Sequence, residues 1–177
     1  MTYWFTADYH LGHANIIGYV GRPFHSLQHM NRVIISNHNQ RVKEDDIVFH
    51  IGDFCFKGNT REIIRYTAKE YKQMLNGSII FLRGNHDNNN GLKTIIDSII
   101  IEHGGYQIYM NHWPENAEDS FPLNFCGHIH ANWKCRRLSS GSILVNVGVD
   151  VWDYRPISIE QILQYLNDNG YKIRNNI

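Results

Sequence analysis

The chain has 177 residues, with 17 basic and 17 acidic side chains, so its formal net charge is zero. Zero net charge gives no general attraction to nucleic acids or membranes, and the sequence lacks the run of about eighteen apolar residues that a membrane span needs. We therefore expect no membrane partner and no long nucleic-acid duplex as substrate. The length suits a single domain spanning residues 1–177, with room for a sizeable core.

The N-terminus and the cysteines indicate a cellular compartment. The first six residues have neither a basic region nor a long apolar stretch, so we expect no secretory signal. The chain has three cysteines and no C-x-x-C pair, which is typical of a reducing compartment rather than of a disulfide framework. These features predict a cytoplasmic protein.

The first half of the chain alternates predicted strands with predicted helices. Short apolar runs, which are typical of buried strands, are separated by segments with helical spacing of apolar residues. Ser26 is a good helix cap at the start of one such segment. The predicted strands are 3–7, 47–51 and 79–82, and the predicted helices are 26–42, 59–75 and 92–97.

The second half is mostly strands. Gly104 and Gly105 permit a tight hairpin turn, Pro114 supports the end of a strand, and Ser158 with Gln161 forms a capping-box pattern that opens a helix. The predicted strands are 99–102, 106–110, 123–126, 133–138, 143–147 and a last edge strand at 171–173, and the predicted helix runs from 158 to 166. This change of pattern indicates a mixed α/β protein.

The stretch Arg83-Gly84-Asn85-His86-Asp87 directly follows the apolar strand 79–82. Open α/β sheets bind their ligands beyond the carboxyl ends of their strands, which is where these polar side chains are expected. The alternative is an ordinary polar turn, because Asn, Asp and Gly are common turn residues.

Four further polar stretches follow predicted strands. Asp8 and His10 are two residues apart, so in an extended segment they point the same way and offer a carboxylate and an imidazole to a divalent metal; the alternative is a solvated loop. The other three stretches are Gly52-Asp53, His112 and Gly127-His128-Ile129-His130.

Together and in this order, the five stretches resemble the signature of the calcineurin-like metallophosphoesterase superfamily, which is D-x-H, G-D, G-N-H-D/E, H and G-H-x-H. The resemblance covers about residues 3–157 and is closest to small prokaryotic and phage enzymes without a cap domain. The tail at 146–150 resembles theirs too. The resemblance implies a sandwich of two mixed β-sheets flanked by helices, in four layers.

The resemblance also implies a centre of two divalent metal ions. Manganese is favoured, with iron, zinc or nickel as alternatives, since oxygen and nitrogen donors without thiolate suit these ions. His86 is expected to be a proton donor or a stabiliser of the transition state, and Asp87 is expected to orient it. The implied ligands are Asp8, His10, Asp53 and His130 for one metal, and Asp53, Asn85, His112 and His128 for the other, with Asp53 as the bridge.

The implied activity is hydrolysis of a phosphodiester, such as a small nucleotide or cyclic phosphodiester, by direct attack of a metal-bound hydroxide. A phosphomonoesterase with the same site is an alternative. A second alternative is a non-catalytic metal-binding interaction scaffold, although no motif residue has been lost. Because so short a chain has no cap to form a pocket, a homo-oligomer is possible.

Two residues are candidates for contact with the substrate. His13 either lines the substrate pocket or caps the turn after the first motif. Arg22 either contacts a phosphate group or is a solvated surface charge. By contrast, we expect His50, inside a strand, to be a packed core residue.

Overall fold

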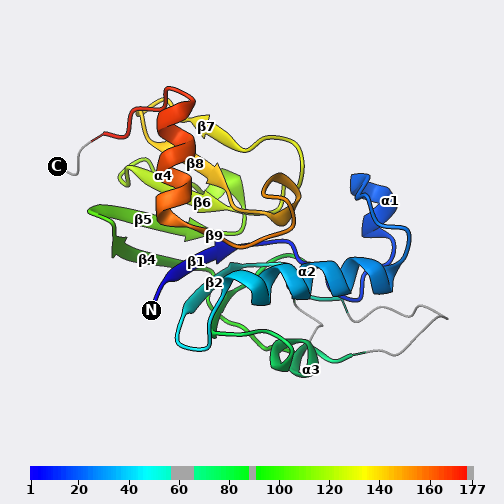
Figure 1. The fold of residues 1–177 in the computed structure, drawn as a ribbon. Helices are drawn as coiled ribbons and strands as arrows, with labels where there is room; N and C mark the ends of the chain where they lie inside the picture. Colours follow the sequence, from blue (N-terminus) through cyan, green and yellow to red (C-terminus); the bar gives the residue numbers. More distant parts are fainter. Residues whose placement is uncertain (57–65, 88–90, 175–177) are drawn as a thin grey trace.

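The computed structural model describes residues 1–56, 66–87 and 91–174. Within these residues the chain forms nine strands, four α-helices and two short 3-10 helices (Figure 1). In chain order they are β1 (Tyr3–Thr6), α1 (Ile16–Val20), α2 (Leu27–Arg41), β2 (Ile47–Ile51), α3 (Ala68–Gln73), β3 (Ser78–Leu82), β4 (Ser98–His103), β5 (Tyr106–Asn111), η2 (Pro114–Asn116), β6 (Leu123–Cys126), β7 (Cys135–Arg137), β8 (Ile143–Asn146), η3 (Val149–Val151), β9 (Ile157–Ser158) and α4 (Ile159–Asp168).

The strands form two mixed sheets. The first has the order β3-β2-β1-β9, with β1, β2 and β3 parallel and β9 antiparallel to β1. The second has the order β4-β5-β6-β8-β7, with β5, β6 and β8 parallel and the two outer strands antiparallel to their neighbours. Parallel strands need crossover connections, and the connection from β1 to β2 contains α1 and α2.

The two sheets share one apolar core. Phe5 of β1 stacks on Phe49 of β2 with ring centroids 5.6 Å apart, and its other neighbour is Phe125 of β6, at 4.9 Å in an edge-on arrangement. Ile162 of α4 is buried in the same cluster. Because aromatic side chains from both sheets meet here, the sheets are held in a fixed relative position.

Helices α2 and α3 pack against the first sheet. Met30 and Ile34 of α2 are buried in a second apolar cluster with Val48 of β2 and Ile79 of β3. The Ser26 side chain accepts a hydrogen bond from the amide of His29, so the predicted cap of α2 is confirmed. The mixed α/β fold with two mixed sheets and flanking helices is as expected. No helix in the described ranges is long and apolar enough to cross a membrane.

The segment 92–97 is not the predicted helix. It runs as an irregular segment before β4, where the Thr94 hydroxyl donates to the Phe81 carbonyl and the Arg83 amide donates to the Ile96 carbonyl. Ordering the first turn of a helix costs conformational entropy, and a six-residue helix forms too few hydrogen bonds to offset that cost. Bonds to the end of β3 therefore prevail over local helical preference.

Three other element predictions need correction. The predicted helix 59–75 lies partly outside the described residues, and within them α3 begins only after Thr67, which caps it with Glu70 in a capping box. The predicted strand 133–138 is shortened to Cys135–Arg137. The predicted edge strand 171–173 is not a strand; the Tyr171 amide instead donates to the Leu166 carbonyl at the end of α4. Helix α1 and strand β9 were not predicted.

Candidate metal centre

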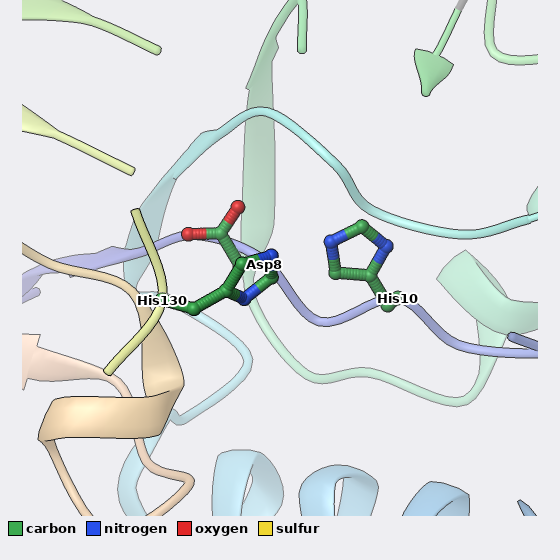
Figure 2. A group of neighbouring side chains, drawn as sticks. All are labelled: Asp8, His10 and His130. Atoms are coloured by element: carbon green, nitrogen blue, oxygen red, sulfur yellow. The ribbon is translucent and has the colours of Figure 1, made fainter. Parts of the chain in front are cut away.

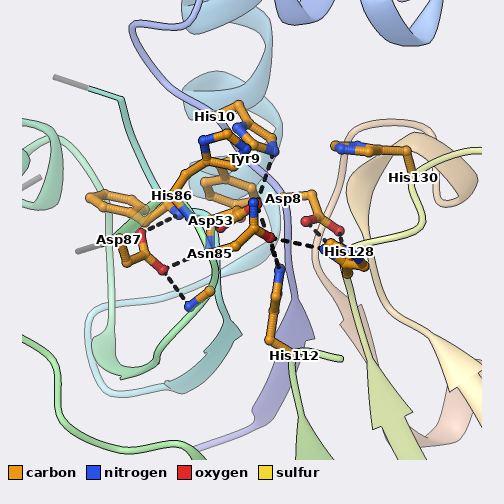
Figure 3. A network of polar contacts seen from close by, with 12 residues as sticks. Asp8, Tyr9, His10, Asp53, Asn85, His86, Asp87, His112, His128 and His130 are labelled. Atoms are coloured by element: carbon orange, nitrogen blue, oxygen red, sulfur yellow. Dashed lines mark hydrogen bonds and ion pairs between the residues drawn. The ribbon is translucent and has the colours of Figure 1, made fainter. Parts of the chain in front are cut away.

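The polar stretches named from the sequence lie in the loops that leave β1, β2, β3, β5 and β6 at their carboxyl ends. Within each sheet these strands run parallel, so their carboxyl ends lie at one edge. The two edges meet, because the His128 amide donates to Asp8 and His112 lies 3.6 Å from Asp53. Figure 3 shows the side chains pointing toward one another from these loops. They are Asp8, His10, Asp53, Asn85, His86, Asp87, His112, His128 and His130.

The backbone of this edge is unusual. Five of the predicted ligands have positive φ: Asp8 59°, His10 50°, Asp53 57°, His128 72° and His130 48°. Such left-handed conformations are uncommon for residues other than glycine and tend to cluster at functional sites. The expectation that Asp8 and His10 share an extended segment was therefore wrong, because each lies at a left-handed bend.

Asp53 occupies the middle of the cluster. One carboxylate oxygen, Oδ1, accepts a hydrogen bond from the His86 amide at 2.9 Å. The other oxygen, Oδ2, lies 3.4 Å from Nε2 of His10 and 3.6 Å from Nε2 of His112. A single carboxylate oxygen thus lies between two imidazoles that come from different sheets.

His112 presents an unprotonated nitrogen to the centre. Its Nδ1 donates to the Ile51 carbonyl at 2.8 Å, and burial lowers the pKa of the ring to about 4, so the ring is neutral at pH 7. Nε2 then carries a lone pair and lies 3.1 Å from the amide oxygen of Asn85, to which His128 Nδ1 is also close at 2.9 Å. The ring nitrogen of His112 and the amide oxygen of Asn85 both have lone pairs of the kind that a divalent cation binds.

Asp8, His10 and His130 form a second group of neighbouring donors, beside the group around Asp53 and His112 (Figure 2). One ligand atom from each lies within 4.8 Å of the others. Asp8 accepts two hydrogen bonds from the His128 amide, at 3.0 and 3.2 Å. Burial of Asp8, and the nearby charges of Asp53 and Asp150, raise its pKa to about 8, although the charge of His130 opposes this rise.

The residues fit a divalent cation. No group in the described part of the chain forms a hydrogen bond with either ring nitrogen of His10, although the residue is only 1% exposed. Burial lowers the pKa of His10 well below its usual value, so the ring is a neutral donor facing buried carboxylates. Imidazole, carboxylate and amide donors are typical of manganese, iron or zinc, and a bound cation would complete the contacts of these buried atoms.

Two glycines give the Asp8 carboxylate its space. A Cβ atom at Gly127 would lie 2.8 Å from Oδ2 of Asp8, and one at Gly148 would lie 2.7 Å from the same oxygen. Both distances are shorter than real Cβ contacts. The glycine of the G-H-x-H motif is therefore required by close packing against a predicted ligand, and Gly148 in the loop after β8 has the same role.

Asp150 and Arg22 complete the surroundings of His130. Asp150 Oδ2 accepts a hydrogen bond from His130 Nδ1 at 2.9 Å. Burial alone would lower the pKa of His130, but this bond and the charges of Asp8 and Asp150 raise it. No role was predicted for Asp150, although it lies in the tail at 146–150 that resembles the family.

Arg22 does not lie where the sequence interpretation placed it. The residue is 4% exposed, and its guanidinium donates to Asp150 and to the carbonyls of Asp8 and Tyr9. It is therefore neither a solvated surface charge nor an arginine with free donors facing the solvent. A buried arginine was not predictable from local sequence, since its ion-pair partner is 128 residues away.

His13 and His86 lie side by side near His10. The ring centroid of His86 is 5.1 Å from that of His10 and 5.7 Å from that of His13. Ligand atoms of His10, Asp53 and His86 also lie within 4.8 Å of one another. His13 is stacked on Phe56 at 4.3 Å, and burial, followed by the nearby charges of His86 and Arg22, lowers its pKa to about 4. The expected contact of His13 with substrate remains a prediction.

Asp87 connects two of the motif loops. Its Oδ2 accepts hydrogen bonds from the amides of Asp53 and Gly84, both at 2.8 Å, and its Oδ1 accepts one from Phe54 at 3.1 Å. These bonds fix the loop after β3 against the loop after β2. Its expected role in orienting His86 remains a prediction.

A histidine and two cysteines near the motif stretches are buried in the core. His50 is 1% exposed and packs edge-on against Tyr9 at 4.7 Å, so the prediction of a packed histidine is confirmed. Cys55 and Cys126 are free and buried.

Comparison with known proteins places the fold and the motifs in context. The sequence matches the family described as calcineurin-like phosphoesterase over residues 1–171. It is 34% identical over 175 residues to an uncharacterized protein of Methanocaldococcus jannaschii, covering 95% of this chain and 92% of that protein. The crystal structure of a protein of unknown function from Aquifex aeolicus aligns with a TM-score of 0.70 and 26% identity, covering 93% of this chain and 98% of the other.

The family match includes every motif stretch described above and both sheets of the fold. The structure brings the motif side chains to one edge of the sandwich, where groups of them can hold a metal ion. The chain belongs to the calcineurin-like phosphoesterase family, whose members typically bind divalent metals.

Proposed function

We propose that the protein is a dinuclear metal-dependent phosphodiesterase acting on a small nucleotide or cyclic phosphodiester. The observation that carries this proposal is the position of Asp53 Oδ2, 3.4 Å from His10 and 3.6 Å from His112. A carboxylate between two sets of donors is suited to bridging two cations. Asp8, His10 and His130 are assigned to one side, and Asn85, His112 and His128 to the other.

The metal ions proposed here are divalent, with manganese favoured by the mixed oxygen and nitrogen donors. Two such ions, when bound, neutralise the phosphoryl charge and activate a water for in-line attack. The role of the chain is to hold the donors at fixed positions, and the buried hydrogen bonds of Asp8 and His112 serve that purpose.

His86 is proposed as the group that delivers a proton to the leaving oxygen. Its backbone is fixed by the bond from its amide to Asp53, and its ring is half-buried beside His10 and His13. A positioned imidazole contributes about 10²–10⁴-fold to such a step. Because His86 also lies close to His10 and Asp53, measuring the metal content of a His86 variant separates this role from that of a ligand.

Preference for a nucleotide is supported by one exposed aromatic side chain, Tyr19, beside His13. Tyr19 of α1 is 76% exposed, and its ring centroid is 6.3 Å from that of His13. His13 in turn lies 5.7 Å from His86. An exposed tyrosine at this distance is placed to stack on a base while the phosphate lies over the metal donors, and such stacking contributes about 1–3 kcal/mol per base.

The proposal is tested by hydrolysis of a chromogenic phosphodiester and of the matching monoester. The protein is stripped of metal and assayed with manganese, with zinc or with no addition. We expect metal-dependent turnover that is faster on the diester. Faster turnover of the monoester would assign a phosphatase, and tight metal binding without turnover of either substrate, or of any nucleotide diester, would favour a non-catalytic scaffold.

A further inference from the structure

We propose that Arg22 and Asp150 are positioning residues that fix the orientation of His130 and hold the loops after β1 and β6 together. This inference rests on the proposed metal centre, because its consequence is the affinity of one of the two metals. Neither residue belongs to the five motif stretches, and neither is placed to touch the substrate.

The pair is buried and has two parallel bonds. Arg22 Nε donates to Asp150 Oδ1 at 2.7 Å, and Nη2 donates to Oδ2 at 2.9 Å. The side chains are 0% and 1% exposed. Removing two charges from water costs several kcal/mol per ion, so buried pairs of this kind are often no more stabilising than apolar residues of the same size. Stability alone is therefore a poor explanation of this pair.

The remaining donors of Arg22 reach the loop that carries Asp8 and His10. Nη2 donates to the carbonyl of Asp8 at 2.7 Å, and Nη1 donates to the carbonyl of Tyr9 at 3.1 Å. These carbonyls belong to the left-handed bend at Asp8. One guanidinium thus holds the backbone between two predicted ligands.

Asp150 extends the same connection to His130. Its Oδ2 accepts both from Arg22 and from His130 Nδ1, the latter at 2.9 Å. Because Nδ1 donates its proton to the Asp150 carboxylate, Nε2 has the free lone pair that a metal can bind. The side chain of His130 is 21% exposed, whereas that of His112 is fully buried, so His130 depends more on this single bond for its orientation.

The test uses metal binding without substrate. Arg22→Lys keeps the charge but loses the two-pronged contact, and Asp150→Asn keeps the shape but loses the charge. The double variant measures whether the two act together, since residues that share one network give non-additive effects. Arg41→Lys is the matched control, because Arg41 also donates to a main-chain carbonyl, that of Pro156, but is not part of the centre.

We expect calorimetric titration of the metal-free wild type with Mn²⁺ to give two sites. In Arg22→Lys and Asp150→Asn one site weakens about 10- to 100-fold, the range typical of lost partners of metal-bound histidines, and the other site is unchanged. The double variant is no weaker than the more affected single variant. Equal weakening of both sites, or full additivity, would overturn the proposal.

A fourth variant separates positioning from folding. Arg22→Met with Asp150→Leu replaces the ion pair with apolar side chains, which is expected to preserve the midpoint of urea unfolding while weakening one metal site as above. Nitrogen NMR of His130 in the metal-free protein, at a pH high enough for the ring to be neutral, gives a second readout, with the Nδ1–H tautomer dominant in the wild type and both tautomers populated in this variant.

The outcomes also distinguish this inference from the proposed function. A wild type that binds two metals, together with a fourth variant whose metal binding and His130 protonation are unchanged, would refute only the positioning role. A wild type that binds no metal would refute the proposed metal centre itself.

Discussion

Replacing Gly148 with alanine is expected to displace the carboxylate of Asp8, a predicted metal ligand. Gly148 has φ −58° and ψ 139°, which alanine adopts without strain, so the effect of the substitution is purely one of space. The new Cβ would lie 2.7 Å from Oδ2 of Asp8 and 2.8 Å from Oδ1 of Asn146. Ordinary contacts begin at 3.4 Å, so the carboxylate of Asp8 would have to move by about 0.7 Å.

Asp8 has little freedom to move. It is fully buried, and the His128 amide donates to both of its carboxylate oxygens. Forcing extra volume into such a site costs about 1–3 kcal/mol, and in a chain of this size each kcal/mol lowers the melting temperature by roughly 2–4 °C. Moving a ligand should also weaken the metal bound by Asp8, His10 and His130.

The measurement is urea unfolding of the metal-free protein, followed by titration with Mn²⁺. Gly18→Ala is the matched control, since a Cβ at Gly18 in α1 has nothing within 4 Å. There alanine should stabilise the protein by roughly 0.5–1 kcal/mol, because glycine is unfavourable within a helix. If Gly148→Ala unfolds at the same urea concentration as the wild type and binds metal equally well, the packing argument is incorrect.

Three further substitutions test separate parts of the account. His86→Ala should lower kcat by about 10²–10⁴-fold with two metals still bound, and loss of metal would instead identify His86 as a ligand. Tyr19→Ala should raise KM for a nucleotide diester with little change in kcat, and an unchanged KM would exclude base stacking on Tyr19. Burial lowers the pKa of His38 to about 4, so the unfolded chain binds its proton more readily and stability is lost as pH falls from 6.5 toward 4. His38→Gln should remove about 1.4 kcal/mol per pH unit from that slope in the metal-free protein, and an identical slope would contradict this assignment.

The positions of most strands were predictable because their sequences are short apolar runs with clear ends, whereas the two-residue strand β9 was not predicted. Ile79–Leu82 lies within β3, and the glycine that follows marks the turn that carries Asn85 and His86. Parallel strand order brings these ends together within each sheet, and the packing of the two sheets brings residues as far apart as Asp8 and His128 into contact. The convergence of the motif residues was therefore predictable from local sequence and the family pattern.

The remaining features depend on contacts between distant residues. The pairing of Arg22 with Asp150 joins residues 128 positions apart, and nothing near Arg22 in the sequence indicates that its charge is buried. Asp8 and His10 have left-handed backbone, and their amides donate to the carbonyls of Gly52 and Asp53 on the neighbouring loop. Neither hydrophobic periodicity nor local propensity carries such information.

Segment 92–97 shows the same limit at the level of secondary structure. Its composition permits a helix, yet the Thr94 hydroxyl and the Ile96 carbonyl bond to residues at the end of β3. Tertiary hydrogen bonds outweigh a weak local preference in so short a segment.

The proposed activity is phosphodiester hydrolysis at two metal ions bridged by Asp53. The most direct measurement titrates the metal-free protein with Mn²⁺ while following both bound metal and turnover of a chromogenic diester, for the wild type and for Asp53→Asn. We expect wild-type activity to rise until two equivalents are bound, and Asp53→Asn neither to retain two metals nor to reach the wild-type rate. Full activity at one equivalent, or an Asp53→Asn variant with two metals and wild-type turnover, would contradict the proposal.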